Sequence, residues 1–235
     1  MNGQSHRGFQ VLNQQPPEKL LISDGELLSV HSKWNTIQGE GLFAGTPASF
    51  IRLVGCNLQC PLCDTDYTSV RKVETITSII EWIENQNHKL VVLTGGEPFR
   101  QNLEKLVMSL FHDSDKLLQI ETNGVFIPES FRTGDATVVC SPKTTKISKR
   151  AGEVVDAWKY VLRAGYIDLL DGLPISALGM NQSPSRPTNN SPIFVQPCDD
   201  KDPVQNRLNL KATVESCMKF GYRLCLQIHK IAEMD

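Results

Sequence analysis

Three cysteines lie within one short stretch of this 235-residue chain, at Cys56, Cys60 and Cys63. Thiolates are soft ligands suited to iron–sulfur clusters, zinc or copper(I), and a short loop can direct several of them at one point. A closed structural zinc site normally has four ligands, often as two separated pairs. No second pair follows in this sequence, since the other cysteines occur singly: Cys140, Cys198, Cys217 and Cys225. The spacing therefore predicts a metal centre with three protein ligands and one position open to an exogenous ligand.

The composition is that of an ordinary globular protein. Hydrophobic residues make up 40% and charged residues 21% of the chain, and the formal net charge is −2. This balance gives no electrostatic attraction to nucleic acid or an anionic membrane, and no apolar run approaches the roughly 20 residues that span a bilayer. The polar N-terminus lacks the apolar core of a secretory signal, and an odd number of cysteines favours reduced thiols. We therefore expect a cytoplasmic protein without nucleic-acid or membrane partners.

The chain is expected to divide near residue 30. Residues 1–30 contain many Gln, Asn, Pro and Gly residues and show no clear periodicity, which predicts a flexible N-terminal tail. Residues 31–235 are expected to form one domain. Its first segment, Trp34–Gly41, is polar and glycine-rich, which predicts a loop whose backbone can approach a ligand closely.

Short apolar runs then alternate with amphipathic segments. We expect strands at 48–54, 90–93, 117–121, 136–140, 157–162, 193–196 and 222–228, and helices at 75–85, 102–111 and 206–220. This alternation predicts an α/β fold with a parallel sheet and right-handed crossovers. Six or seven strands fall short of the eight in a closed barrel, so the prediction is a partial, open parallel β/α barrel of about six strands. Residues 171–191, rich in Pro, Asn and Ser, are expected to form a lid or a partly disordered loop.

Polar stretches repeatedly follow the predicted strands. The cysteine stretch is one of them, and the others are TGGEP at 94–98, ETNG at 121–124, SPK at 141–143, QPCD at 196–199 and QIHK at 227–230. Carboxyl ends of parallel strands point to one side of the sheet, where α/β folds build their sites. We therefore expect the cysteines and these stretches to share one rim.

The cysteine spacing together with Gly95-Gly96-Glu97 resembles the radical S-adenosylmethionine superfamily, in which three cysteines hold a 4Fe–4S cluster whose open iron binds S-adenosylmethionine. Within it, the chain is most similar to the 7-carboxy-7-deazaguanine synthase family of queuosine and 7-deazapurine biosynthesis. The residues that carry this resemblance run in family order from 34 to 230: TIQGEG at 36–41, FIRL at 50–53, Gly55-Cys56, CDT at 63–65, TGGEP at 94–98, IET at 120–122 with Gly124, SPK at 141–143, Gln196-Pro197, and Gln227 with His229-Lys230.

The resemblance implies a reaction and its participants. The expected enzyme is a homodimer that converts 6-carboxy-5,6,7,8-tetrahydropterin to 7-carboxy-7-deazaguanine with release of ammonia. Its cofactors would be a 4Fe–4S cluster, S-adenosyl-L-methionine and Mg²⁺, and a flavodoxin-like or ferredoxin-like protein would donate electrons. The 5′-deoxyadenosyl radical would abstract hydrogen from C6 of the pterin, while the protein orients the reactants and excludes water.

The resemblance also implies roles for individual residues. The cluster ligands would be Cys56, Cys60 and Cys63, and Thr65 would ligate Mg²⁺, a cation that prefers hard oxygen ligands. The substrate would be bound by Ile37, Gln38, Gly39, Arg52 and Thr94, with Arg52 placed to make a forked contact to a carboxylate. S-adenosylmethionine would be bound by Gly96, Glu121, Ser141, Pro142, Lys143, Gln196, Pro197, Cys198 and Asp199.

Four positions remain open at this point. Glu121 and His229 lie on the predicted rim, and each could be a structural polar residue instead of a ligand-binding one. Leu62 stands where the superfamily often has an aromatic residue against the adenine, so an apolar contact would replace stacking. Cys198 is more typical of a small core residue than of a further cluster ligand.

Two alternative functions also follow from the same residues. A glycyl-radical-enzyme activase shares the cysteine loop but would not need the QGEG, Arg52 and CDT residues. A metal-binding regulatory protein would hold zinc at the cysteines.

Overall fold

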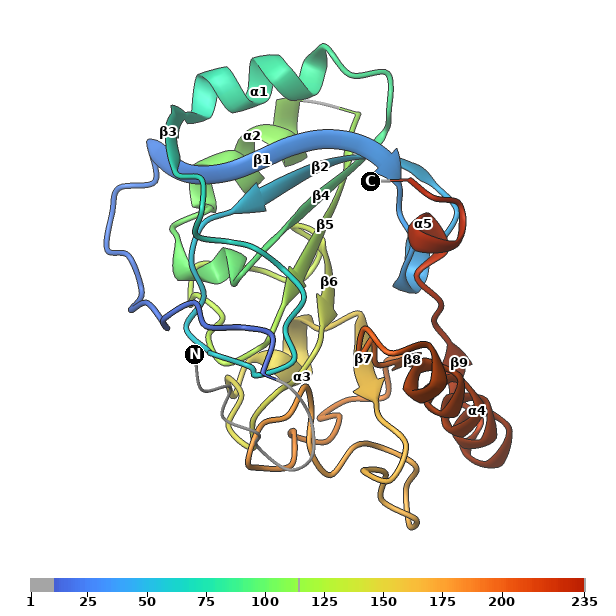
Figure 1. The fold of residues 1–235 in the computed structure, drawn as a ribbon. Coiled ribbons are helices and arrows are strands. Elements are labelled where there is room, and N and C mark those ends of the chain that lie inside the picture. Colours follow the sequence, from blue (N-terminus) through green and yellow to red (C-terminus); the bar gives the residue numbers. More distant parts are fainter. Residues whose placement is uncertain (1–10, 114, 235) are drawn as a thin grey trace.

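A computed structural model describes residues 11–113 and 115–234 (Figure 1). Within these residues a single sheet of nine strands has the order β3-β1-β2-β4-β5-β6-β7-β8-β9. The strands are β1 (Leu27–Ile37), β2 (Pro47–Leu53), β3 (Lys72–Thr75), β4 (Leu90–Gly95), β5 (Leu117–Thr122), β6 (Thr137–Cys140), β7 (Ala157–Leu162), β8 (Ile193–Pro197) and β9 (Arg223–Leu224). The helices are α1 (Ile76–Glu84), α2 (Glu104–Asp113), α3 (Ala151–Val154), α4 (Pro203–Phe220) and α5 (Ile228–Ile231), with short 3-10 turns at Gly41–Phe43 and Pro98–Arg100.

The sheet is mostly parallel and does not close. Each neighbouring pair from β2 to β9 is parallel, while β1 pairs with both β2 and β3 in the antiparallel direction. Strands β3 and β9 form its two edges. The prediction of an open parallel β/α barrel is therefore confirmed, with an antiparallel ribbon added at one side.

Local sequence explains where the longer helices begin and end. The Thr75 side chain accepts a hydrogen bond from the Ser78 amide (3.1 Å) and so caps the start of α1. Asp202 caps α4 in the same way, and Gly221 ends it with a left-handed φ of 76°. Figure 1 shows α1 and α2 together beside the sheet, whereas α4 lies near β8 and β9.

The two faces of the sheet differ in what covers them. Ile51 and Leu53 of β2 belong to the main hydrophobic core, which also contains Ile79 of α1 and Leu106 of α2. Because side chains alternate along a strand, Arg52 points to the opposite face. Packing on the helix side thus leaves the other face free to line a site.

The structure differs from the sequence prediction at both ends of the domain. The first half of the predicted loop at 34–41 is strand, since β1 runs from Leu27 to Ile37, whereas residues 38–40 belong to no helix or strand. The expected boundary near residue 30 falls inside β1. The strand predicted at 222–228 is wrong beyond Leu224, because Ile228 already begins α5. Residues 1–10 of the predicted tail lie outside the described residues. Residues 11–26 have no regular structure, yet they contact the domain, as shown below.

Two further observations concern the loop and the helices. Residues 171–191 are held by side chains, including an ion pair between Arg186 and Asp171 (2.6 Å) and a hydrogen bond from the Tyr160 hydroxyl to the Ser185 carbonyl (2.7 Å).

Among the residues that the structure describes, every helix is too short or too polar to cross a bilayer.

Candidate active site at the carboxyl ends of the strands

One large cavity lies against the free face of the sheet and encloses about 420 Å³. Its walls come from residues far apart in the sequence: the end of β1, the loop after β2, and the segments that end β4, β5, β6 and β8. The C-terminal residues 227–230 line it as well. The expected shared rim therefore exists, and it surrounds a volume suited to a small molecule.

The three cysteines of the loop after β2 all line this cavity. Cys56 and Cys60 are buried, and Cys63 is partly buried. The Leu58 amide donates a hydrogen bond to the Cys56 sulfur (3.4 Å), and the Cys63 amide donates to the Cys60 carbonyl (3.1 Å). All three thiols are free, so the loop presents them to one chamber without a disulfide.

The three thiols that line one cavity form a donor set that fits an iron–sulfur cluster. A four-iron cluster takes one thiolate on each iron, so its ligands face a common space without meeting at one point. Burial raises the pKa of the Cys56 and Cys60 thiols to about 12. Since a metal binds the thiolate, loading this site would release protons.

The segment after β4 approaches the cysteine loop with its backbone. A Cβ on Gly96 would lie 2.3 Å from the Gly55 carbonyl oxygen and 2.7 Å from the Cys56 Cβ, so only glycine fits there. Next to it, Glu97 is fully buried and accepts hydrogen bonds from the Thr122 hydroxyl (2.7 Å) and the Asn123 amide (2.7 Å). Glu97 thereby joins the segments that end β4 and β5.

Two lysines, one partly buried and one buried, contribute positive charge to the cavity wall. The Lys143 ammonium donates to both the carbonyl and the hydroxyl of Ser141 (2.6 and 2.5 Å), and burial lowers its pKa. Lys159, in the middle of β7, forms an ion pair with Glu40. Burial opposes the charge on Lys159, but the attraction of Glu40 raises its pKa overall. Lys143, by contrast, has no carboxylate among its described hydrogen-bond partners, so it is available to an anionic ligand.

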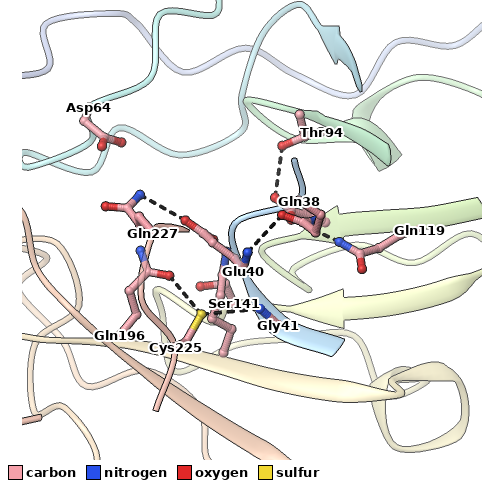
Figure 2. A network of polar contacts seen from close by, with 12 residues as sticks. Gln38, Glu40, Gly41, Asp64, Thr94, Gln119, Ser141, Gln196, Cys225 and Gln227 are labelled. Atoms are coloured by element: carbon pink, nitrogen blue, oxygen red, sulfur yellow. Dashed lines mark hydrogen bonds and ion pairs between the residues drawn. The ribbon is translucent and has the colours of Figure 1, made fainter. Parts of the chain in front are cut away.

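A polar network connects β1, β4 and β5 across the cavity. The Gln38 side-chain amide donates to one Glu121 oxygen (3.1 Å), and the Thr94 hydroxyl donates to the other (3.2 Å). Glu121 also accepts from Gln119 (3.1 Å). Figure 2 shows Gln38 next to Glu40, which accepts a hydrogen bond from Gln227 (2.9 Å). The network presents amide and carboxylate groups together, which suits a ligand with paired donors and acceptors.

Arg52 points from β2 into the same cavity and has no carboxylate partner among its described contacts. Its guanidinium lies 4.9 Å from the ring centre of Trp34. Its Nε is buried and lacks a hydrogen-bond partner among residues 11–113 and 115–234. Burial lowers the pKa of Arg52, against the attraction of Asp64, Asp66 and other acidic groups. A buried donor without a partner costs free energy, so this arrangement favours a ligand that supplies an anionic acceptor.

The C-terminal residues close one side of the cavity. The Ile228 amide donates to the Gly39 carbonyl (3.2 Å), and a Cβ on Gly39 would lie 2.0 Å from the His229 Nδ1. Lys230 forms ion pairs with Asp64 of the cysteine loop (3.0 Å) and with Asp199 after β8 (3.1 Å). Helix α5 is thus tied to both the cysteine loop and the end of β8.

The structure brings together most of the residues singled out from the sequence. The cavity lining contains Ile37, Gln38, Arg52, Cys56, Cys60, Cys63, Thr65, Thr94, Gly96, Glu121, Ser141, Lys143, Gln196, Pro197, Asp199 and His229. Three residues lie outside the lining: Gly39, Pro142 and Cys198. Cys198 is buried against Leu62, as expected of a small core residue, and Leu62 itself lines the cavity.

Sequence reasoning placed Asn123 and Trp34 in stretches near the site but gave them no individual role, and it missed Lys159 altogether. One signal was available for Lys159. It stands inside the apolar strand AWKYVL, and a charged residue in such a run usually has a partner, which is the reasoning applied to Arg52.

Comparison with known proteins places these features in a family. The sequence profile of the 4Fe-4S single cluster domain matches residues 37–126. A 7-carboxy-7-deazaguanine synthase of Rhodospirillum rubrum is 39% identical over 222 residues, which cover 90% of this chain and 94% of that protein. The enzyme of the same name from Rickettsia prowazekii is 33% identical over 240 residues, covering 97% of both chains. The crystal structure of QueE from Escherichia coli superposes with a TM-score of 0.66 at 25% identity, over 86% of this chain and 94% of that one.

Proposed function

Because this chain belongs to the 7-carboxy-7-deazaguanine synthase family, we propose that its cavity converts 6-carboxy-5,6,7,8-tetrahydropterin to 7-carboxy-7-deazaguanine with release of ammonia. The observation that carries this proposal is the convergence of three buried thiols, the Gly96 backbone, the Gln38–Glu121 network and Arg52 on one cavity. Neither alternative function predicts this combination. A zinc-binding regulator needs no such cavity, and an activase that acts on a protein backbone needs no buried guanidinium.

The cofactors of this enzyme are a 4Fe–4S cluster and S-adenosylmethionine. When bound and reduced, they supply the 5′-deoxyadenosyl radical that begins the reaction. Cys56, Cys60 and Cys63 would hold the cluster from the loop after β2. The Gly96 backbone, which only a residue without Cβ can bring so close to Cys56, would hold the cofactor beside it.

Residues after β6 and β8 would complete the binding of S-adenosylmethionine. The Lys143 ammonium is partly buried next to Ser141 and suits a carboxylate or a ribose oxygen. Gln196 and Asp199 line the same side of the cavity and would contact the rest of the cofactor. Pro142 and Cys198 would act only through the backbone shape of these segments, since neither lines the cavity.

The pterin would lie against the polar network of β1 and β5. Gln38 and the adjacent backbone at Ile37 and Gly39 present donors and acceptors to its amide-like edge, while Glu121 orients Gln38 and Thr94. The unpartnered Arg52 guanidinium would bind the carboxylate of the substrate through a forked contact. Burial strengthens such charge-assisted hydrogen bonds because water competes less there.

Several parts of the proposal rest on the family resemblance. Thr65, which lines the cavity two residues after Cys63, would supply a hydroxyl ligand to Mg²⁺. The enzyme would act in the cytoplasm as a homodimer, and a flavodoxin-like or ferredoxin-like protein would reduce its cluster. We place residues 31–235 in the catalytic domain, together with the first residues of β1.

A direct activity assay tests the proposal. The reconstituted enzyme is given reductant, S-adenosylmethionine, Mg²⁺ and the carboxytetrahydropterin, and the product is identified by mass spectrometry. We expect 7-carboxy-7-deazaguanine from the parent enzyme and none from Cys56→Ala, Cys60→Ala or Cys63→Ala. An enzyme that cleaves S-adenosylmethionine but leaves the pterin unchanged would contradict the substrate assignment.

A further inference from the structure

The N-terminal residues 12–18 cover the outer side of the cysteine loop. They lie outside the residues that match the cluster-domain profile, which begins at residue 37. Their sequence, LNQQPPE, has no apolar periodicity and predicts a flexible tail. In the structure, however, Asn13 is only 4% exposed, although it is polar and far in sequence from its neighbours in space.

This segment satisfies backbone carbonyls along the whole cysteine loop. The Pro61 carbonyl accepts hydrogen bonds from the Leu12 and Asn13 amides (2.9 and 3.1 Å), and the Cys56 carbonyl accepts one from the Glu18 amide (2.7 Å). The Asn13 side chain donates to the Cys60 carbonyl (3.2 Å). Two of these carbonyls belong to cysteines that would hold the cluster, so the contacts act directly on ligand-bearing residues.

Gln15 fixes the end of the loop. Its side-chain amide donates to the Thr65 carbonyl (2.8 Å), while its oxygen accepts from the Tyr67 amide (2.8 Å) and the Thr68 hydroxyl (2.8 Å). The same amide also donates to the Asn13 oxygen (3.1 Å), which links the two residues. Gln15 therefore uses both ends of its side chain on partners in and beside the cysteine loop.

Leu12 adds an apolar contact. It packs against the small cluster formed by Leu62 and Cys198, and Leu62 lines the cavity just before the third cysteine. The cysteine loop contains no helix or strand of its own. Its shape must therefore come from contacts made by other segments, and residues 12–18 supply many of them.

We propose that Asn13 and Gln15 are positioning residues for the iron–sulfur cluster: they hold the cysteine loop in its ligand-binding shape and limit solvent access to the cluster. Contacts that orient metal ligands and control exposure affect both the retention and the reduction potential of a metal centre. The inference rests on the cluster of the proposed function, but its test requires no pterin. Failure of the substrate assignment and failure of this inference are thus separate results.

The test compares Gln15→Leu with Gln14→Leu, the same substitution one residue earlier at an exposed position. Both reconstituted variants and the parent are exposed to air, and cluster loss is followed by visible absorbance and by iron released to a chelator. We expect Gln15→Leu to lose its cluster roughly tenfold faster than the parent, because several hydrogen bonds to the loop are lost together. The Gln14→Leu control should match the parent.

The midpoint potential of the cluster separates positioning from a general loss of stability. Greater exposure stabilises the more negatively charged reduced state, so the potential of Gln15→Leu should shift in the positive direction while that of the control stays unchanged. If Gln15→Leu does not fold, Asn13→Ala removes the hydrogen bond to the Cys60 carbonyl and should give the same two effects. Equal cluster lifetimes and potentials in the position 13 or 15 variant and the control would overturn the proposal.

Discussion

Replacing Arg52 by lysine tests the assignment of the substrate carboxylate. The change keeps a positive charge on the cavity face of β2 but removes the planar fork that can bind both carboxylate oxygens. Within the described residues the Nε of Arg52 has no partner, and the guanidinium lies 4.9 Å from the Trp34 ring centre, an interaction that a lysine ammonium can also make. We therefore expect the main effect on the pterin complex and little effect on folding.

The magnitude follows from the hydrogen bonds involved. A hydrogen bond to a charged group contributes about 1.5–3 kcal/mol, and lysine would lose one of the two formed by the fork. This loss corresponds to about a 10- to 150-fold weaker affinity for the pterin. If the contact is the same in the ground state and the transition state, KM rises by this factor and kcat changes little.

The assay measures KM and kcat for the pterin and for S-adenosylmethionine separately, together with direct pterin binding. Arg207→Lys, on the exposed side of α4, is the matched control and should behave as the parent. The thermal midpoint of Arg52→Lys should change little, because the variant keeps a positive charge beside the Trp34 ring. An unchanged KM for the pterin combined with a raised KM for S-adenosylmethionine would refute the assignment. A lowered thermal midpoint with unchanged kinetics would instead indicate a structural role.

Three other predictions concern neighbouring residues. In Gly96→Ala, the new Cβ would meet the Gly55 backbone, which should abolish binding of S-adenosylmethionine and lower the free energy of unfolding by about 1–3 kcal/mol without preventing folding. An unchanged affinity for S-adenosylmethionine in calorimetry would contradict this prediction. Burial raises the pKa of Glu97 from 4.5 to about 7, so the folded protein keeps a proton that the unfolded chain has released between these pH values. Stability should therefore fall by up to about 3 kcal/mol as pH rises through this window, since each pKa unit corresponds to about 1.4 kcal/mol; a flat profile in denaturant unfolding would argue against it. Thr65→Ala should weaken the response of activity to Mg²⁺ more than tenfold by removing a hydroxyl ligand; an identical Mg²⁺ titration in parent and variant would exclude that role.

The central part of the fold followed from local patterns. The apolar runs at 48–54, 90–93 and 117–121 are confirmed as β2, β4 and β5, and the isoleucine stripe at 76, 79 and 83 faces the core from α1. Burial and periodicity are properties of neighbouring residues, so they can be recognised in a single sequence. The sequence also predicted that the cysteines and the polar strand ends lie together, because this depends only on the common direction of parallel strands.

The remaining features depend on partners distant in sequence. Strand β1 was missed because its polar residues gave no clear alternation, and its pairing with β2 decides its structure. The prediction for 222–228 failed because only Arg223 and Leu224 pair with β8, after which Gln227 turns toward Glu40. The contacts of Asn13 and Gln15 join residues about 50 positions apart, and such pairs leave no trace in composition or periodicity.

The transfer of hydrogen from the pterin to the cofactor tests the central claim most directly, because it requires cluster, cofactor and substrate to occupy the same cavity. The parent enzyme is given substrate labelled with deuterium at C6, and 5′-deoxyadenosine is analysed by mass spectrometry. The arrangement of Cys56, Gly96 and Arg52 around one cavity predicts that the label is recovered in 5′-deoxyadenosine together with formation of 7-carboxy-7-deazaguanine. Unlabelled 5′-deoxyadenosine, formed at the same rate with and without the pterin, would contradict the account.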